Sequence, residues 1–524
     1  MSETAQQASV LIVEHMLDDL QSLRTIIGVL GYKKVQVASS VNMALSLFRE
    51  ENYDLCFVAY DLGQGEKNGL QLLQELQHEG LRRYQQCFVL IVDQEKSELL
   101  FGSPENAPDT YVSKPFDPHR IRQRLDKVVR IKASIKPVDQ LLDKGDWDEA
   151  LQVSAKLSQL YPGLRIYIER IRGLLLLQLK RYADAYNLFS AILKQKDESW
   201  VRVAVAVSAY GSGDFKEARR QLDHVLNRQQ VCVEAFVWRS RLHRLEGEWG
   251  QALSLMRRAV MLQPTVSLLQ SDLGELASFN EEWALAIEAF KASVKYARYS
   301  GFQTPDIYFA LVYSLLRQVR SETALSSEAQ LDAIRIMEQA QRDYMDEPVI
   351  LFKSRLISSE VYRLSGDTER ANSMANLAMA GFKALPADDQ AMWLEMLTDS
   401  LENMPQADEA SEFKQQLTKQ MASLTWGRAN LKGMMEFRKG NLKGARDQFR
   451  AARKERPDNP SIGLNLVQVA LELCKRSSGD EVHAWLYESD ETLYEIQFAA
   501  LTSRQQGRFK TLSKRLTEQV KKLA

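Results

Sequence analysis

The chain has 524 residues, which is too long for a single hydrophobic core, so two or more domains are expected. Its 68 lysines and arginines nearly balance its 69 aspartates and glutamates, which argues against nucleic acid or an anionic membrane as the main partner. The N-terminus lacks a signal-peptide pattern, and no apolar run is long enough for membrane insertion. The four cysteines show neither metal-ligand nor disulfide spacing, so we expect reduced thiols in a cytoplasmic protein.

Strand and helix signals alternate over residues 1–130. Short apolar runs predict strands at 9–13, 34–39, 53–60, 87–93 and 109–116, and amphipathic segments predict helices at 17–31, 41–51, 69–80 and 117–135. Units of this kind predict an α/β domain with a doubly wound, flavodoxin-like parallel sheet. Sites in such a sheet form at the carboxyl ends of the strands, so the residues that follow the predicted strands are the functional candidates.

From residue 131 to 457 the strand signals end and one pattern recurs, in which a small or polar turn precedes an aromatic or apolar residue and an alanine stands three positions later. The alanines are Ala150, Ala185, Ala218, Ala252, Ala286 and Ala445. The first five are 35, 33, 34 and 34 residues apart. This period, with helix–turn–helix content, is typical of the tetratricopeptide (TPR) repeat and predicts an all-α solenoid.

Further marks support the repeat. Phe189, Phe290 and Phe449 each follow an alanine by four positions, and Gly173, Gly274 and Gly433 stand where two helices approach closely. Weaker units surround Ala333 and Ala371. The period slips at 316–330 and 385–425, where we expect longer loops or helices. Residues 458–524 lack the pattern and are expected to cap the solenoid with irregular helices.

The first helices of the repeats are predicted to line a groove that binds other proteins. Counting back from the alanines places five residues at groove positions, namely Arg170, Trp200, Tyr210, Arg241 and Arg244. Arginines there would bind a peptide or helix with carboxylate groups through paired hydrogen bonds. The alternative is that Trp200 and Tyr210 pack between repeats and that the arginines are solvated.

Residues 8–130 resemble the receiver domain of two-component response regulators. The resemblance rests on "VLIVEH" at 10–15, "YDLCFVAYDLG" at 53–63, "NGLQLL" at 68–73, "FVLIVD" at 88–93 and "YVSKPF" at 111–116. In that family an acidic pair after the first strand holds Mg²⁺, and an aspartate after the third strand takes the phosphoryl group. A hydroxyl residue after the fourth strand and a lysine on the fifth contact the phosphate, and an aromatic residue near the lysine reports activation.

Those positions correspond here to Glu14 and His15, Ala59, Val92, Lys114 and Tyr111. Ala59 supplies no nucleophile, His15 replaces a carboxylate that Mg²⁺ prefers, and Val92 lacks the hydroxyl. The sequence therefore predicts a degenerate receiver without a bound cofactor, in which Glu14 and Lys114 pair across the vacated site. The alternative is that Asp61, eight residues before Gly69, is the acceptor, with Mg²⁺ at Glu14 and Asp61.

A receiver followed by TPR repeats is similar to response regulators of the VieB-like class. The resemblance implies a bacterial signalling adaptor that is not an enzyme and that acts by contact with a protein, such as another signalling regulator or a cyclic-di-GMP enzyme. Its contact surfaces would be the repeat groove and the receiver face around Tyr111 and Phe116, and its oligomeric state is left open. The alternative is a response regulator switched by phosphorylation of Asp61, with the repeats as its output.

Overall fold

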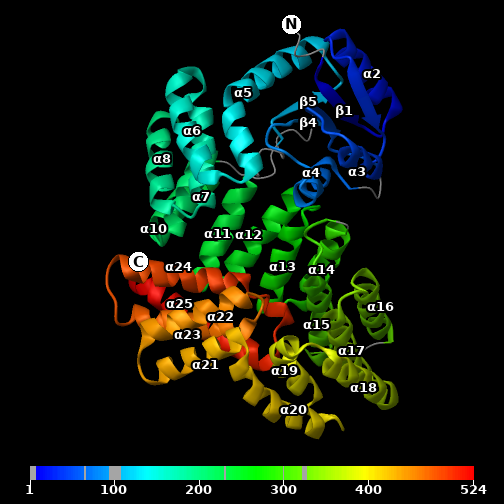
Figure 1. The fold of residues 1–524 in the computed structure, drawn as a ribbon, viewed down its shortest axis with the longest axis vertical. Helices are drawn as coiled ribbons and strands as arrows, with labels where there is room; N and C mark the ends of the chain where they lie inside the picture. Colours follow the sequence, from blue (N-terminus) through cyan, green and yellow to red (C-terminus); the bar gives the residue numbers. More distant parts are fainter. Residues whose placement is uncertain are drawn as a thin grey trace. The chain divides into compact units, whose positions relative to one another are not determined.

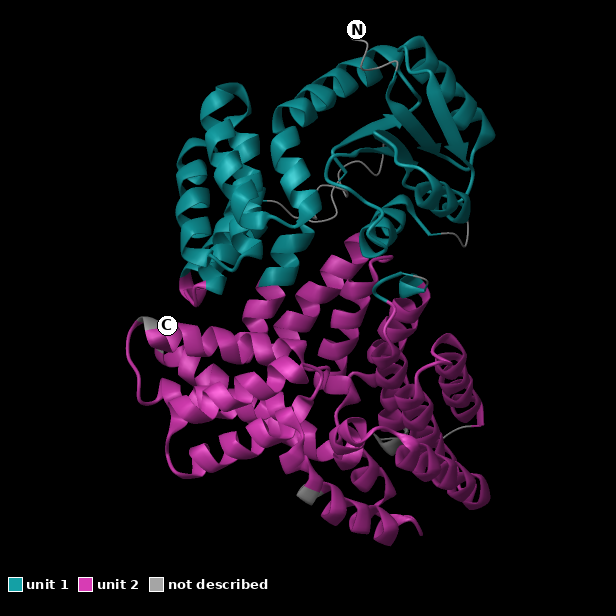
Figure 2. Cartoon of the chain, in the orientation of Figure 1, with its two compact units in different colours: residues 1–211, 217–238, 296–302 teal, residues 212–216, 239–295, 303–524 magenta. Residues whose placement is uncertain are grey.

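The computed structural model describes residues 7–63, 67–93, 108–228, 232–298, 300–321 and 327–523. The chain forms two compact units, of which the first comprises residues 1–211, 217–238 and 296–302 and the second residues 212–216, 239–295 and 303–524 (Figure 2). The units do not follow the predicted division between receiver and repeats, because the first unit holds both. Within the described ranges, no helix has the length and apolar character that a membrane crossing requires.

The first unit begins with a parallel sheet in the order β2-β1-β3-β4-β5 (Figure 1). Its strands are β1 (Ser9–Val13), β2 (Lys34–Ala38), β3 (Leu55–Ala59), β4 (Cys87–Asp93) and β5 (Thr110–Lys114). Every residue of β3 is buried, as expected for a parallel strand covered on both faces. Helices α2 (Leu17–Val29), α3 (Val41–Glu50) and α4 (Gly69–His78) pack around this core. The predicted doubly wound α/β fold is confirmed.

Helix α5 (Pro118–Lys144) joins the sheet domain to the first repeat without a break. Asp117 caps its N-terminus, and Gly145 ends it in the left-handed conformation with φ 81°. Ile121, Leu125 and Val128 in its first half belong to the core of the sheet domain. Ile135, Val138 and Leu142 in its second half belong to the core of the first repeats. The domain boundary predicted at residue 130 therefore falls inside one helix.

The rest of the described chain is helical. Its α-helices are α6 (Trp147–Leu160), α7 (Arg165–Gln178), α8 (Tyr182–Gln195), α9 (Ser199–Gly211), α10 (Phe215–Arg228), α11 (Val233–Leu245), α12 (Trp249–Leu262), α13 (Ser267–Phe279), α14 (Trp283–Ala297), α15 (Pro305–Ser321), α16 (Ser327–Asp343), α17 (Pro348–Leu364), α18 (Thr368–Ala384), α19 (Ala387–Leu401), α20 (Ala407–Gln420), α21 (Thr425–Arg438), α22 (Leu442–Glu455), α23 (Pro460–Cys474), α24 (Asp480–Glu495) and α25 (Ser503–Leu523). Single 3₁₀ turns are η2 (Pro162–Leu164), η3 (Met421–Ser423) and η4 (Phe498–Ala500). The predicted TPR solenoid is confirmed.

The repeat alanines lie in the second helix of each helix pair, as the sequence pattern predicts. They are fully or almost fully buried in α6, α8, α10, α12, α14, α16, α18 and α22. The repeat glycines face the repeat phenylalanines of the same pair: a Cβ added to Gly173 would lie 2.1 Å from the Phe189 ring, and one added to Gly274 would lie 2.7 Å from Phe290. Small residues on both helices thus let the two helices of a pair approach closely.

The slip in the period has a structural cause. Helices α15, α16, α17 and α18 each have 17 residues, whereas α6, α7 and α8 each have 14. The extra turn lengthens the spacing around 316–330, although residues 322–326 lie outside the described ranges. Residues 385–425 hold a further helix pair, α19 and α20. The C-terminal α23, α24 and α25 are regular helices rather than irregular ones.

The close approach at Gly274 can be tested by adding one methyl group. Gly274→Ala should lower the free energy of unfolding by about 1–3 kcal/mol, because the new Cβ overpacks against Phe290. Gly250→Ala is the matched control, since this helical glycine has no atom within 4 Å of an added Cβ. The control should be neutral or stabilising by up to about 1 kcal/mol. Equal effects of both changes on urea denaturation would contradict the packing role.

Candidate functional site

The carboxyl edge of the sheet brings three of the predicted site residues together. In the register of the sheet, Val13 at the end of β1 lies opposite Val58 of β3. The next residue on each strand is Glu14 and Ala59, so these two residues occupy the same level on neighbouring strands. Lys114 is the last residue of β5. The register thus places Ala59, and not Asp61, beside the acidic residue that follows β1.

A buried ion cluster occupies this edge. The Lys114 ammonium lies 2.8 Å from Glu14 Oε2 and 2.7 Å from Asp19 Oδ2. Glu14 is fully buried, and its Oε1 accepts the Met16 backbone N–H at 3.0 Å. Burial by itself lowers the pKa of the Lys114 amine, but hydrogen bonds to Asp19 and Glu14 outweigh that effect and raise the pKa above its usual value. The amine therefore stays charged and is held by two carboxylates.

Ala59 is sealed into the core. Its side chain is 1% exposed, and α4 begins directly against it. A Cβ at Gly69 would lie 2.2 Å from the Ala59 carbonyl oxygen, so only glycine fits there. Gly69 also donates its N–H to the Tyr60 oxygen at 2.9 Å, and Asn68 caps α4 in a capping box with Gln71. The end of β3 and the start of α4 therefore pack closely around Ala59, whose side chain is a methyl group.

Asp61 lies two residues beyond the end of β3 and is exposed. Its Oδ1 accepts the Gly63 backbone N–H at 3.0 Å, which is a local turn contact. Residues 64–66 of the following loop lie outside the described ranges. The Lys114 ammonium, which an acceptor carboxylate would need nearby, is bound to Glu14 and Asp19 instead.

The other predicted positions lack phosphate chemistry as well. His15 Nδ1 lies 3.2 Å from Glu14 Oε1, so the imidazole and the Lys114 ammonium contact the same carboxylate. Val92 is 1% exposed within β4. Tyr111 is half-buried, and Arg124 of α5 covers its ring at 4.1 Å and donates to its carbonyl oxygen. These residues do not fit Mg²⁺, which needs several free oxygen ligands, because the one buried carboxylate is already bound by an ammonium.

Sequence reasoning missed Asp19, which completes the ion cluster. It stands in the first turn of α2, where an acidic side chain is favoured by the helix dipole. The sequence offered one signal: Asp19 stands five residues after Glu14, in the first turn of the helix predicted at 17–31. Without the structure, that position is also explained by helix capping alone.

The ion cluster predicts the cost of removing Lys114. Lys114→Met should lower the free energy of unfolding by about 3 kcal/mol, because it leaves Glu14 buried without its counter-charge. The double change Glu14→Gln with Lys114→Met should recover part of that loss. Lys33→Met, at an exposed lysine, should change stability by less than about 0.5 kcal/mol in the same urea titration. A loss at Lys114 no larger than that at Lys33 would contradict the cluster.

A second buried charge cluster lies where the sheet domain meets the first repeats. Lys132 of α5 has its ammonium 3.1 Å from Asp109 Oδ1 and 3.5 Å from Asp139 Oδ2, and it donates to the Tyr84 oxygen at 2.6 Å. Asp143, one turn further along α5, accepts the Tyr84 N–H at 2.6 Å. These contacts join α5 to the loop before β4 within the first unit.

Asp139 predicts how this junction depends on pH. Burial raises the pKa of its carboxyl from the usual 3.8 to about 7, with Lys132 opposing and Asp109 adding to the shift. The folded state therefore keeps a proton that the unfolded chain loses above about pH 4, so this group's contribution to stability falls as pH rises from about 4 to 7. Asp139→Asn should flatten the dependence of the melting temperature on pH in that window. Asp126→Asn, at an exposed site on the same helix, should leave the slope unchanged.

Two of the predicted groove residues in the first unit, Trp200 and Tyr210, are packing residues. Tyr210 is 1% exposed and packs edge-on against Trp238 at 5.3 Å, so it does not face a groove. Trp200 packs edge-on against Phe189 at 6.4 Å and donates its indole N–H to Glu198. Arg170 lies over the Trp200 ring at 4.9 Å, and burial lowers the pKa of its guanidinium. The packing alternative therefore describes Tyr210 and Trp200.

The two remaining groove candidates lie in the second unit and bind carboxylates of the chain itself. Arg241 donates to Asp490 Oδ2 at 3.1 Å and 3.2 Å and also to Glu491. Arg244 lies 3.7 Å from Asp490 Oδ1. The sequence pattern predicted carboxylate binding by these arginines, but the carboxylates belong to α24. The alternative of solvated arginines is wrong here, because their side chains are only 11% and 14% exposed.

A pocket of about 450 Å³ lies between the first helices α15, α17 and α19 and the segment around η4. Lys353 at its wall is 5% exposed, and its ammonium lies 3.1 Å from Asp306 and 4.2 Å from the ring centres of Phe309 and Trp393. A lysine held between two aromatic faces is a cation–π arrangement. Sequence reasoning missed this pocket because the repeat period slips there, so no groove positions were counted.

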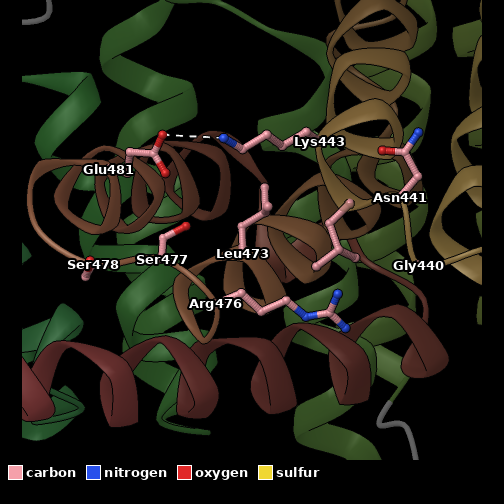
Figure 3. Close-up of a pocket in the computed structure, with 9 residues that line it drawn as sticks. Gly440, Asn441, Lys443, Leu473, Arg476, Ser477, Ser478 and Glu481 are labelled. Carbon is pink, nitrogen blue, oxygen red and sulfur yellow. Dashed lines mark hydrogen bonds and ion pairs between the residues drawn. The ribbon is translucent and has the colours of Figure 1, made fainter.

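A second pocket, of about 510 Å³, lies at the turn between α21 and α22 (Figure 3). Its charged residues include Lys443 and Glu481, which pair at 3.5 Å.

Elsewhere in the second unit, one group among the described residues has metal-ligand geometry, namely His243, Glu246 and Glu248. Arg239 lies 3.1 Å from Glu246 and places a positive charge beside this group, and His243 Nδ1 lies 2.5 Å from Glu248.

The comparisons with known proteins agree with the two modules. Residues 10–126 match the response regulator receiver domain, and residues 204–266 match the tetratricopeptide repeat. The chain therefore carries a receiver domain and TPR repeats, which pair a module of two-component signalling with modules of protein–protein interaction. No curated protein matches the sequence. The likeness to VieB-type proteins stays a prediction.

Solved structures resemble parts of the chain. The C-terminal part of a TPR repeat-containing protein from Cytophaga hutchinsonii is 16% identical and covers 48% of this chain and 96% of its own, with a TM-score of 0.38. NtrX from Brucella abortus is 21% identical and covers 26% of this chain and 29% of its own, with a TM-score of 0.23. A two-component response regulator from Clostridium difficile is 18% identical and covers 24% of this chain and 97% of its own, with a TM-score of 0.21.

Proposed function

We propose that the chain is a two-component-type signalling adaptor that acts by protein–protein contact and does not depend on phosphorylation. The observation that carries the proposal is the ion cluster beside Ala59. A methyl group stands where a nucleophilic carboxylate would be needed, and the Lys114 ammonium is bound to Glu14 and Asp19. A phosphoryl group that used this lysine would have to displace both carboxylates from the ammonium.

The contact between the receiver and the repeats supports a fixed role for the receiver. Gln71 of α4 donates its side-chain N–H to the Tyr296 oxygen at 3.1 Å. Gly301 lies so close to the His78 ring that an added Cβ would meet it at 2.1 Å. Within the first unit, the helix that begins beside Ala59 is thus held by residues 296–302 of the repeats.

The receiver face around Tyr111 and Phe116 is the surface that we propose for a partner. Arg120 and Arg122 of α5 are exposed beside it, so an acidic partner surface would be attracted. The partner is a protein, and a signalling regulator or a cyclic-di-GMP enzyme are the classes that fit a receiver–TPR adaptor. The fused α5 makes the full chain the proper reagent, because truncation at residue 135 would cut this helix.

The proposal is tested by capture of partners from the native cell with the full chain, with and without acetyl phosphate and Mg²⁺. We expect no phosphate incorporation, measured by intact mass, and the same captured proteins under both conditions. Asp61→Asn should behave like the wild type. Incorporation that is lost in Asp61→Asn would establish the phosphorylated alternative, and the absence of any enriched partner would contradict the adaptor role.

A further inference from the structure

The C-terminal part of the second unit crosses three first helices of the repeats in succession. Residues 490–494 contact α11 and α13, residue 499 contacts α13 and α15, and residue 501 contacts α15. Residue number along this segment thus rises in step with helix order. We call residues 490–501 the cis segment, and we call its partners Arg241, Arg244, Asp272, Glu275 and Arg317 the receptor residues.

At α11 and α13 the recognition is by side chains. Asp490 is 2% exposed and is bound by Arg241 at 3.1 Å, which also binds Glu491. Tyr494 lies under both arginines, at 4.1 Å from Arg241 and 4.7 Å from Arg244, and its hydroxyl donates to Asp272 at 3.0 Å. The two adjacent carboxylates thus bind the arginines of α11, and the tyrosine three residues later packs under the same arginines and donates to the aspartate of α13.

At α13 and α15 the recognition is by backbone. Glu275 accepts the Ala499 N–H at 3.0 Å, and Arg317 donates to the Ala499 and Leu501 oxygens at 2.6 Å and 2.8 Å. Side chains of the segment are packed here as well: Phe498, Ala499 and Leu501 are at most 4% exposed, and the Phe498 ring centre lies 5.1 Å from that of Phe279. A peptide bound here would therefore also need small and apolar residues at these positions. Burial raises the pKa of the Glu275 carboxyl to about 7, and the Ala499 N–H opposes that shift.

The contact between α24 and α11 is made by long charged side chains, whereas α24 has a second attachment to the C-terminal helices. Trp485 and Leu486 are buried, Arg446 covers the Trp485 ring at 4.1 Å, and Arg446 and Arg450 both bind Glu488. α24 therefore keeps its packing on α22 and α23 when its contact with α11 opens. Charged contacts hold Asp490 and Glu491, whereas Leu493, Phe498 and Leu501 of the same segment are 3–4% exposed and pack as part of a core.

We propose that the receptor residues form a peptide-binding surface, that the cis segment is its in-chain occupant, and that the partner presents two adjacent carboxylates with a tyrosine three residues later. The cis segment then competes with the partner, because covalent attachment gives it a high effective concentration. This inference rests on the proposed adaptor function and names the chemistry of its partner.

The test asks whether an added peptide can replace the cis segment in the full chain. The probe is a fluorescent peptide of residues 487–503, and its binding is measured by anisotropy. The wild-type chain should bind it weakly, whereas the chain with Asp490→Arg and Glu491→Arg should bind it at least about tenfold more tightly, because charge reversal opposite Arg241 releases the occupant. Glu518→Arg, an exposed charge reversal on α25, should behave like the wild type.

Two further binding measurements test whether the peptide is recognised at the receptor residues. A peptide that carries the same two charge reversals should not bind the released chain. Arg317→Met in the released chain should weaken peptide binding, because it removes two backbone contacts. Equal peptide binding by the wild-type and released chains, with both melting cooperatively, would overturn the proposal.

A second measurement needs no variant. In hydrogen exchange on the unmodified chain, residues 485–501 should exchange faster than α23, because the cis segment opens while α23 stays packed. Exchange in 485–501 that is as slow as in α23 would show a fixed cap and overturn the inference. Neither experiment involves phosphate, so uptake of phosphate would refute the proposed function and leave this inference standing.

Discussion

The arrangement of the first unit depends on one helix that belongs to two cores. α5 contributes Ile121 and Leu125 to the receiver core and Val138 and Leu142 to the repeat core, so neither core is complete without it. Lys132 near the middle of this helix binds Asp109 and Asp139, and Pro137 lies in its second half. The receiver and the first repeats therefore share one helix on which both cores depend.

The edge of the receiver sheet is stabilised by the ion cluster of Glu14, Asp19 and Lys114. The lysine at the end of β5 balances the charge of two carboxylates that come from the end of β1 and the first turn of α2. A carboxylate at position 59 would compete with them for the same ammonium.

The fold followed from the sequence because the signals were local and repeated. The alanine period marked every second helix up to α14, and the glycine–phenylalanine pairs marked where helices touch. The position of Ala59 was predicted by counting along the chain from the motif at 10–15, and the resemblance to receivers led to the pairing of Glu14 with Lys114, whose atoms lie 2.8 Å apart. What the sequence did not provide were the contacts of Asp19 with Lys114 and of Asp490 with Arg241, and the pocket at Lys353. Each joins residues on different elements, and no local pattern encodes which elements meet.

The distance along the chain between Arg241 and Asp490 also bears on how the protein is made. The two residues are separated by 249 positions, so this contact forms only after Asp490 has been synthesised. Until then Arg241 lacks the two carboxylates that bind it. Closure of so long a loop is an entropic cost that grows only slowly with length, so the late arrival delays the contact without greatly weakening it. A nascent or prematurely ended chain is thus the natural form in which this surface stands open.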